Sequence, residues 1–168
     1  LPAGIRKARN NSRANSRKNI HAHYDLGNAF YELWLDPTMN YSSAWFDGDF
    51  SRTTSHAQSA KVRRALHMAG VQAGAGQRVL EIGCGWGALA ECAAREFNST
   101  VTGVTLSKEQ LALAQQRADE LGLAHKISFE FKDYRDVTGL FDRIVSVGMF
   151  EHVGANHYRE YFDKVRDL

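Results

Sequence analysis

Three closely spaced glycines, Gly83, Gly85 and Gly87, form the stretch of this sequence best suited to chemistry. They follow the apolar run Val79–Ile82 and precede an alanine-rich helical pattern. A chain that turns at the end of a buried strand, with a helix N-terminus behind it, offers bare backbone to a nucleotide. Gly83, Gly85 and Ala88 also match the spacing G-x-G-x-x-G/A, which NAD, FAD and S-adenosyl-L-methionine (SAM) sites share. The glycines alone leave these ligands open, and also a tight turn without a ligand.

Two neighbouring features favour SAM among these ligands. An NAD site expects an acidic residue at the end of the second strand to bind the ribose hydroxyls, but the run Val101–Ser107 contains no carboxylate. Glu81 stands two residues before the first glycine, and the pattern E-x-G-x-G-x-G resembles the first motif of the SAM-dependent methyltransferases. The missing acid also departs from most of that superfamily.

The residues after the second strand support two interpretations. In a capping box S-x-x-Q, Ser107 caps a helix and the Gln110 side chain reaches back to the Ser107 amide. The same segment lies where a ribose-binding carboxylate is expected, so Gln110 is also a candidate to bind the ribose hydroxyls. Both interpretations stay open on the sequence alone.

The composition is typical of one soluble globular domain, with 168 residues, 43% hydrophobic and 24% charged. The net charge is only +2, but residues 1–20 contain no acid. The cations there are Arg6, Lys7, Arg9, Arg13, Arg17 and Lys18. Such an arm is either solvated and flexible or a contact for anionic membrane lipids. Nucleic acid is less favoured than lipid as its partner. We therefore predict no nucleic-acid partner.

Cysteine usage and hydropathy indicate the compartment. Cys84 and Cys92 fit neither a disulfide framework nor a zinc cluster, which favours free thiols in a reducing compartment. His21, His23 and Asp25 have no second cluster of ligands, so no metal site is predicted. No apolar run approaches the ~20 residues of a membrane span, and no signal peptide is evident. We expect a cytoplasmic protein, peripheral to the inner membrane face where the arm binds lipid.

Alternating strand and helix patterns from residue 71 onward predict an α/β fold of the Rossmann-like type. Strands are expected at 78–83, 100–106, 127–133 and 142–148, and helices at about 86–97, 107–121 and 156–167. Right-handed crossovers at this pitch give a parallel sheet that helices cover on both faces.

The residues before this unit have a helical pattern. A helix over 54–69 is expected to end at Gly70. A shorter helical pattern places Phe30, Leu33 and Trp34 on one face, and we expect Phe30 and Trp34 in the core. The predicted domains are a basic flexible arm (1–20), a helical segment that covers SAM and substrate (21–70) and a SAM-binding Rossmann-like domain (71–168).

Several motifs, in order along the chain, give a specific resemblance to a known family. From about Asn19 onward they are His23–Asn28, Tyr41–Ser43, Leu80–Gly87, Thr105–Gln110 (T-L-S-x-x-Q), Asp133–Asp136 and, most diagnostic, Phe141–Gly154. Together they resemble the cyclopropane-fatty-acid synthase family, which includes the mycolic acid cyclopropane synthases. The resemblance implies a class I SAM-dependent methyltransferase fold with an N-terminal helical lid.

The resemblance also assigns SAM contacts residue by residue. They fall on Tyr41, Ser42, Gly83, Gly85, Thr105, Leu106, Gln110, Tyr134 and Arg135, to which the glycine motif adds Glu81 and Gly87. In this family the glutamine of T-L-S-x-x-Q replaces the ribose-binding acid, which explains why the second strand carries none.

A catalytic bicarbonate ion is implied as well, held through a glutamate that matches Glu151 and the residue at the position of Ser43. The family usually reads Y-S-C where this chain reads Tyr41-Ser42-Ser43. A backbone amide contact from Ser43 to bicarbonate survives that change, whereas a role that needs a thiol does not. The simpler interpretation of Glu151 is a helix-start carboxylate that the helix dipole favours.

The implied reaction transfers a methyl or methylene group from SAM to the double bond of an unsaturated fatty acyl lipid or phospholipid. An alkene is a weak nucleophile, so the site must orient it, exclude water and stabilise a carbocation. Aromatic faces stabilise cations, and the candidates are Tyr24, Phe30, Tyr41, Trp45 and Phe150. Tyr24 joins Glu151 and Ser43 in the predicted catalytic set.

The chain departs from the family in its extent. A methyltransferase sheet has seven strands in the order 3-2-1-4-5-7-6, and four are expected here. The sheet is therefore truncated after the fourth strand, whose open edge lies next to the site. This predicts a fragment of a longer polypeptide, or a partner subunit or second copy that supplies the rest. Methylation of a small molecule such as an amine, and a SAM-binding subunit that is inactive alone, are the alternative functions.

Overall fold

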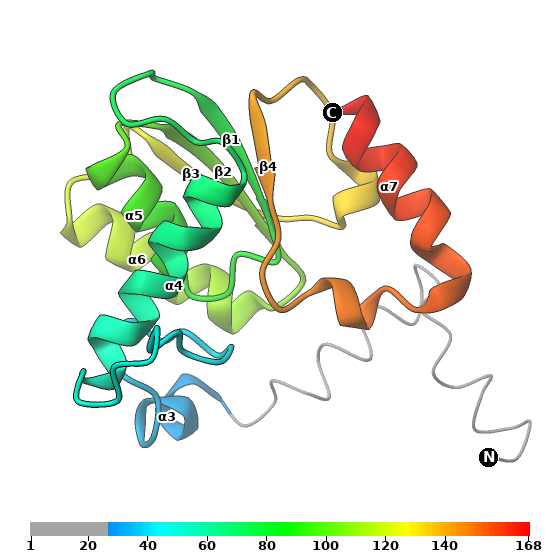
Figure 1. Cartoon of the computed structure of the whole chain (residues 1–168). Coiled ribbons are helices and arrows are strands. Elements are labelled where there is room, and N and C mark those ends of the chain that lie inside the picture. The colour runs from blue at the N-terminus through cyan, green and yellow to red at the C-terminus, as the bar shows by residue number, and fades with distance from the viewer. Residues whose placement is uncertain (1–26) are drawn as a thin grey trace, which may run out of the picture.

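Four parallel strands form the centre of the molecule. The computed structural model describes residues 27–168, so the predictions made for residues 1–26, including the role of Tyr24, lie outside the described residues. The strands are β1 (Arg78–Ile82), β2 (Thr100–Thr105), β3 (Ile127–Phe131) and β4 (Arg143–Val145). They lie in the order β3-β2-β1-β4 (Figure 1). This confirms the predicted parallel sheet and its strand order.

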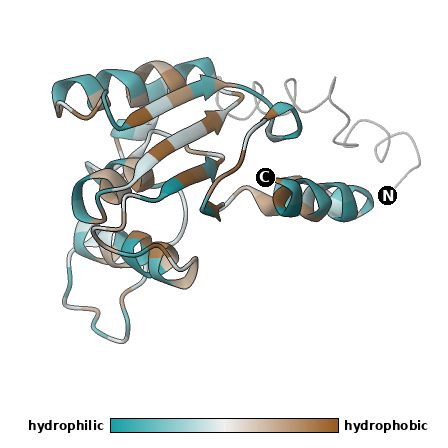
Figure 2. Ribbon diagram, turned by 90° about the horizontal axis from the view of Figure 1, so that it is seen from above, coloured by the Kyte–Doolittle hydropathy of each residue, from teal (hydrophilic) through white to brown (hydrophobic). Residues whose placement is uncertain are grey.

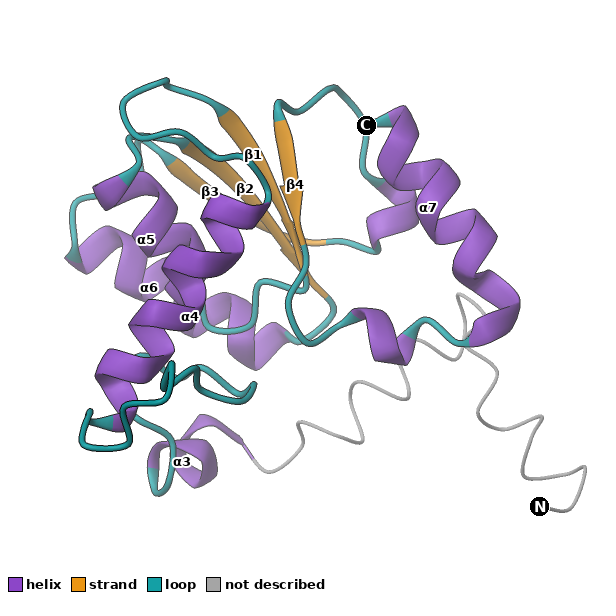
Figure 3. Cartoon of the chain, viewed as in Figure 1, coloured by secondary structure: helices purple, strands orange, loops and turns teal. Residues whose placement is uncertain are grey.

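Helices cover both faces of the sheet (Figures 1 and 3). Helices α4 (Thr54–Met68), α5 (Ala88–Glu96) and α6 (Lys108–Glu120) lie on one face, and α7 (Tyr158–Asp167) lies on the other. Side chains alternate between the faces along a strand. Val79 of β1 accordingly packs in the cluster of α4 and α5, and Leu80 and Ile82 pack in the cluster that contains Tyr161 of α7. In Figure 2 the strands carry brown residues interrupted by white and teal ones, and the apolar residues of β1 are buried on both faces of the sheet.

Among the element boundaries that differ from the sequence prediction, those of α5 and β4 have clear local reasons. Helix α5 begins at Ala88, because Gly87 before it has a φ of 88° that a helix interior does not allow. Strand β4 ends at Val145, and the Ser146 hydroxyl then donates to the Ile82 carbonyl oxygen at 2.9 Å in place of a ladder bond. Within residues 27–168, β4 pairs with β1 alone, as the predicted open edge requires.

The N-terminal described residues contain one wrong prediction. Helix α3 (Gly27–Glu32) forms where expected, but Trp34 is 53% exposed and Phe30 is 40% exposed. Tyr31 takes the buried position instead and packs on Trp86 with ring centroids 5.1 Å apart. A helix of fewer than two turns presents only a narrow face, so helical spacing did not identify the buried ring.

Short 3-10 turns complete the chain. They are η1 (Tyr134–Asp136), η2 (Phe150–His152) and η3 (Ala155–His157). Among the residues that the structure describes, none of the helices combines the length and the apolar character needed to cross a membrane.

Candidate functional site

The glycine turn lies at the carboxyl edge of the sheet, between β1 and α5. All three glycines have left-handed backbone conformations, with φ of 82° at Gly83, 53° at Gly85 and 88° at Gly87. A Cβ on Gly83 would lie 2.8 Å from the Met149 Cβ, and one on Gly87 would lie 2.8 Å from the Phe129 Cζ. A Cβ on Gly85 would meet no atom within 4 Å. Packing therefore requires the outer two glycines, while the middle one leaves bare backbone beside open space.

The Phe129 ring also lies against β2. A Cβ on Gly103 would lie 2.7 Å from the Phe129 Cδ1 and 2.9 Å from the Cys84 Cβ. The backbone amides of Gly83 and Cys84 both donate to the Val104 carbonyl oxygen, at 2.9 and 3.1 Å. The glycine turn is thus fixed directly on the second strand. Cys84 and Cys92 are both free thiols.

Glu81 is buried beneath this turn. Its side chain accepts a hydrogen bond from the Ala90 amide, and Lys61 of α4 stabilises its charge, but burial is the larger effect and raises the pKa of the Glu81 carboxyl to about 8. The second carboxyl oxygen, Oε2, is buried without a hydrogen-bond partner among residues 27–168. An unpaired buried oxygen is costly.

The end of β2 and the start of α6 form a buried polar network. The Ser107 hydroxyl caps α6 by accepting from the Gln110 amide at 3.3 Å, as predicted. The reciprocal half of the capping box is wrong: the Ser107 amide donates to the Thr105 hydroxyl at 3.1 Å, and not to Gln110. Thr105 is nearer along the chain and in turn donates to the Gln110 Oε1 at 3.0 Å. Leu106, half-buried, lies between them.

This network leaves the amide nitrogen of Gln110 available. Within the described part of the chain, the only side-chain hydrogen bond of Gln110 is the one that its Oε1 accepts from Thr105. The Gln110 residue is 5% exposed. The capping function therefore does not use the Gln110 side chain, and its Nε2 is a fixed donor at the carboxyl edge.

Tyr134 and Arg135 follow β3 at the same edge. The Arg135 guanidinium forms a two-point ion pair with Asp133, with Nε–Oδ1 2.8 Å and Nη2–Oδ2 2.6 Å. This hydrogen bonding raises the pKa of Arg135 above its usual value. The guanidinium also lies over the Tyr134 ring, 5.5 Å from its centroid, and that ring packs on Tyr161 of α7 at 5.2 Å. Arg135 thus orients the Tyr134 ring.

The segment 36–43 brings Tyr41, Ser42 and Ser43 to this edge. The position that a Cβ would take on Gly148 lies 3.5 Å from the Ser42 Cβ and 3.9 Å from the Glu151 Oε1. Ser42 and the exposed Glu151 therefore lie beside one another across Gly148, although they are far apart in sequence. Ser43 is exposed, and the Tyr41 ring packs on Tyr31 with centroids 5.3 Å apart.

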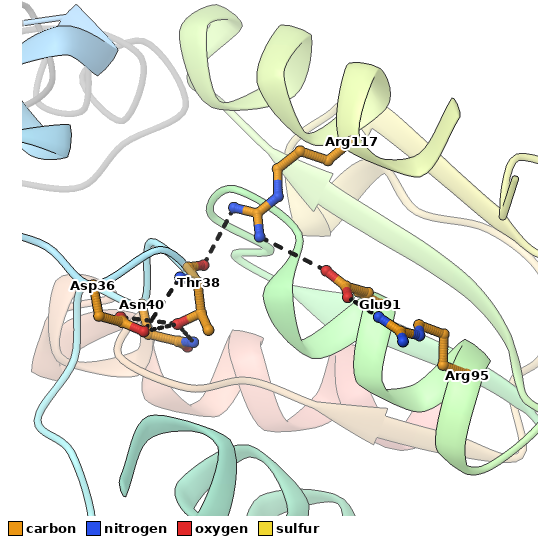
Figure 4. Close-up of polar contacts among 6 residues, drawn as sticks. All are labelled: Asp36, Thr38, Asn40, Glu91, Arg95 and Arg117. Atoms are coloured by element: carbon orange, nitrogen blue, oxygen red, sulfur yellow. Dashed lines mark hydrogen bonds and ion pairs between the residues drawn. The ribbon is translucent and has the colours of Figure 1, made fainter. Parts of the chain in front are cut away.

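The same segment is attached to two helices. Figure 4 shows Arg117 of α6 between the Thr38 carbonyl oxygen, at 3.4 Å, and the Glu91 carboxylate of α5, at 3.7 Å. Asp36 accepts from the Thr38 and Ser55 hydroxyls, both at 2.9 Å, and so ties the turn to α4. A pocket of about 380 Å³ on the outer side of this turn contains none of the predicted site residues; it is lined by Glu32, Leu35, Asp36, Pro37, Met39, Leu113 and Arg117.

Two residues that hold the segment were missed by the sequence analysis. Gln58 and Lys61 of α4 donate to Asn40 and Ser42. Their spacing, one helical turn apart, was a usable signal because Gln58 shares the buried face with Ala57 and Val62. A buried polar side chain on such a face needs a partner.

The sequence is similar to that of known proteins. The family model for mycolic acid cyclopropane synthetase matches residues 11–168. A probable fatty acid methyltransferase of Pseudomonas putida is 47% identical over 87% of this chain, and the cyclopropane-fatty-acyl-phospholipid synthase of Escherichia coli K12 is 47% identical over 83%. The chain spans only 37% and 35% of the lengths of these two proteins.

A solved structure agrees with the sequence relatives. The mycolic acid cyclopropane synthase CmaA1, in complex with SAH and CTAB, superposes with a TM-score of 0.83 at 37% identity, covering 89% of this chain and 52% of that one. The fold is thus the Rossmann-like fold of class I SAM-dependent methyltransferases. Because the family model spans nearly the whole sequence, the chain belongs to the mycolic acid cyclopropane synthetase family.

Proposed function

We propose that this chain binds SAM at the carboxyl edge of its sheet, and that the natural polypeptide that contains it is an enzyme that transfers a methyl or methylene group to the double bond of an unsaturated fatty acyl chain. The observation that carries the proposal is the meeting of Ser42 and Glu151 across Gly148, next in the chain to Met149, whose side chain lies against Gly83 of the glycine turn. The names of the relatives support the substrate class. The SAH in the structure of CmaA1 supports the cofactor.

The residues present suit SAM. The open space at Gly85 admits a ligand against bare backbone, and Gly87 leads into the N-terminus of α5. The fixed Nε2 of Gln110 suits a ribose hydroxyl, since a hydroxyl oxygen accepts hydrogen bonds. The remaining contacts are assigned to Tyr41, Ser42, Glu81, Gly83, Thr105, Leu106, Tyr134 and Arg135. When bound, SAM supplies an electrophilic methyl group on a sulfonium.

The chain's own residues then orient the substrate and hold a base. Glu151 and Ser43 would hold a bicarbonate ion, Glu151 by its carboxylate and Ser43 by its backbone amide. A carboxylate hydrogen-bonded to a small base positions that base without lying against the reacting carbon. The rings of Phe30, Tyr41, Trp45 and Phe150 are the described candidates to shield positive charge on the acyl chain, and Tyr24 is the candidate outside the described residues.

Lipid extraction tests this function. The natural polypeptide is incubated with methyl-labelled SAM and vesicles of unsaturated phospholipid, and label is followed into the extracted acyl chains. Label in a cyclopropane or methyl-branched chain supports the proposal. Label confined to an added amine would select small-molecule methylation, and SAM binding with no labelled product would select a cofactor-binding subunit.

Gln110→Ala is expected to lower SAM affinity about fivefold, because one hydrogen bond to the ribose is worth on the order of 1 kcal/mol. Stability should also fall, since the Thr105 hydroxyl loses its acceptor. Calorimetric titration with SAM, corrected for the folded fraction, measures the first effect and thermal unfolding the second. Lower stability with unaltered affinity would leave Gln110 a structural residue only.

We further propose that residues 1–20 bring the protein to anionic membranes at the cytoplasmic face. Neutralising Arg13, Arg17 and Lys18 is expected to weaken vesicle binding by ~1 kcal/mol per charge at low salt, because each cation near an anionic surface contributes about that much. The difference should shrink as salt rises. Co-sedimentation with anionic and neutral vesicles measures the effect, and equal binding of the wild type to both would contradict it.

A further inference from the structure

The segment 36–43 needs to be held in place, because little in its own backbone fixes it. It contains neither helix nor strand. Met39 within it has a φ of 56°, a left-handed backbone conformation that residues other than glycine adopt only at an energetic cost. The position of Ser42 at the candidate site therefore depends on contacts from outside the segment.

Helix α4 provides those contacts at Asn40 and Ser42. The Lys61 ammonium donates to the Ser42 Oγ at 2.7 Å and to the Asn40 Oδ1 at 3.2 Å. One turn earlier, the Gln58 amide donates to the backbone carbonyl oxygens of the same two residues, at 2.8 Å to Ser42 and 3.3 Å to Asn40. Gln58 fixes the backbone, while Lys61 fixes the Ser42 hydroxyl itself.

Lys61 also has an electrostatic link to the glycine turn. Burial lowers its pKa to about 8, while the charges of Asp36 and Glu81 favour its protonated form. Glu81 lies under the glycine turn with one oxygen unpartnered in the described part of the chain. The two carboxylates therefore offset only part of the cost of burying this cation.

We infer that Lys61 is a positioning residue that sets the Ser42 hydroxyl for the cofactor. This inference rests on the proposed function, because the ligand whose affinity it controls is SAM. If Lys61 serves only the packing of α4, its loss should change stability and leave the SAM affinity of the folded protein unaltered.

A double-mutant cycle tests the inference with SAM as the probe in calorimetric titrations. Lys61→Met keeps the aliphatic stem and removes the ammonium, and Ser42→Ala removes its acceptor. Each single change is expected to weaken SAM binding about tenfold, as for one hydrogen bond to a charged group. The double variant should bind no more than a few-fold more weakly than either single variant, because both remove the same interaction.

Lys126→Met is the matched control. Lys126 also donates to an asparagine side chain, the Asn98 Oδ1 at 2.5 Å, but it precedes β3 and so lies at the amino edge of the sheet. The SAM affinity of the Lys126→Met variant should equal that of the wild type. Lys61→Arg, which keeps the charge and its donors, should restore part of the affinity lost in Lys61→Met.

The outcomes separate this inference from the proposed function. Additive losses in the double variant, or a folded Lys61→Met with wild-type SAM affinity, would overturn the role of Lys61. A wild-type protein that does not bind SAM would instead overturn the proposed function. Where circular dichroism shows Lys61→Met to be unfolded, Lys61→Gln takes its place in the same cycle.

Discussion

Glu151→Gln is expected to lower the turnover of an unsaturated acyl substrate by roughly 10²- to 10⁴-fold, the usual loss when acid–base assistance is removed. Glutamine keeps the size of the side chain and some of its hydrogen bonding but removes the charge that orders the base. SAM affinity should stay within a few-fold of the wild type, because Glu151 is not among the residues assigned to the cofactor. Turnover by the natural polypeptide and SAM titration are measured in parallel.

Two comparisons make this result specific. Added bicarbonate should stimulate the wild type and rescue Glu151→Gln poorly. Glu120→Gln changes an exposed carboxylate at the far end of α6, where its partner is Gln116, and should leave turnover unchanged. Turnover of Glu151→Gln comparable to wild type, or a loss explained wholly by weaker SAM binding, would remove Glu151 from the catalytic residues.

Gly85→Val is expected to abolish SAM binding. Its side chain would enter the space beside the turn that is open at this position, and the backbone φ of 53° would add strain of about 1–3 kcal/mol. The valine side chain would occupy the space where SAM binds, and the backbone strain would lower the stability of the fold. Calorimetric titration with SAM on protein shown to be folded measures the loss of binding.

Gly122→Val separates the two effects. Gly122 has a φ of 68° and also has no atom within 4 Å of the position of a Cβ, but it follows α6 at the opposite edge of the sheet. The strain should be comparable, so stability should fall similarly while SAM affinity stays at the wild-type level. Unchanged SAM affinity in folded Gly85→Val would contradict the assignment of the cofactor site.

The sequence was most informative where a local pattern determines the backbone. The glycine turn and the Ser107 cap follow from residue types at fixed spacing, and the structure confirms them. The strand order follows from the family resemblance, and the structure confirms it too. The partner of the Ser107 amide was wrong, because Thr105 at the strand end competes with Gln110 for the same donor. Choices between neighbouring partners depend on distances that spacing does not give.

Tertiary contacts explain the other differences. Whether Phe30 or Tyr31 is buried depends on where Trp86 lies, and the two rings are on adjacent residues of one short helix. The importance of Lys61 depends on the path of the 36–43 segment over α4, which no periodicity describes. The family resemblance named Ser42 and Glu151, but their proximity across Gly148 is a property of the folded chain.

The Phe129 ring gives the glycine turn an evolutionary constraint. It fills the places that side chains at both Gly87 and Gly103 would occupy, so three positions from three different elements share one volume. The Phe129 ring therefore limits what either glycine position can accept. An alanine at 103 would meet both the Phe129 ring and the Cys84 Cβ, so a smaller residue at 129 removes only one of two obstacles. Gly87, whose φ of 88° is independent of that ring, is expected to remain glycine in either case.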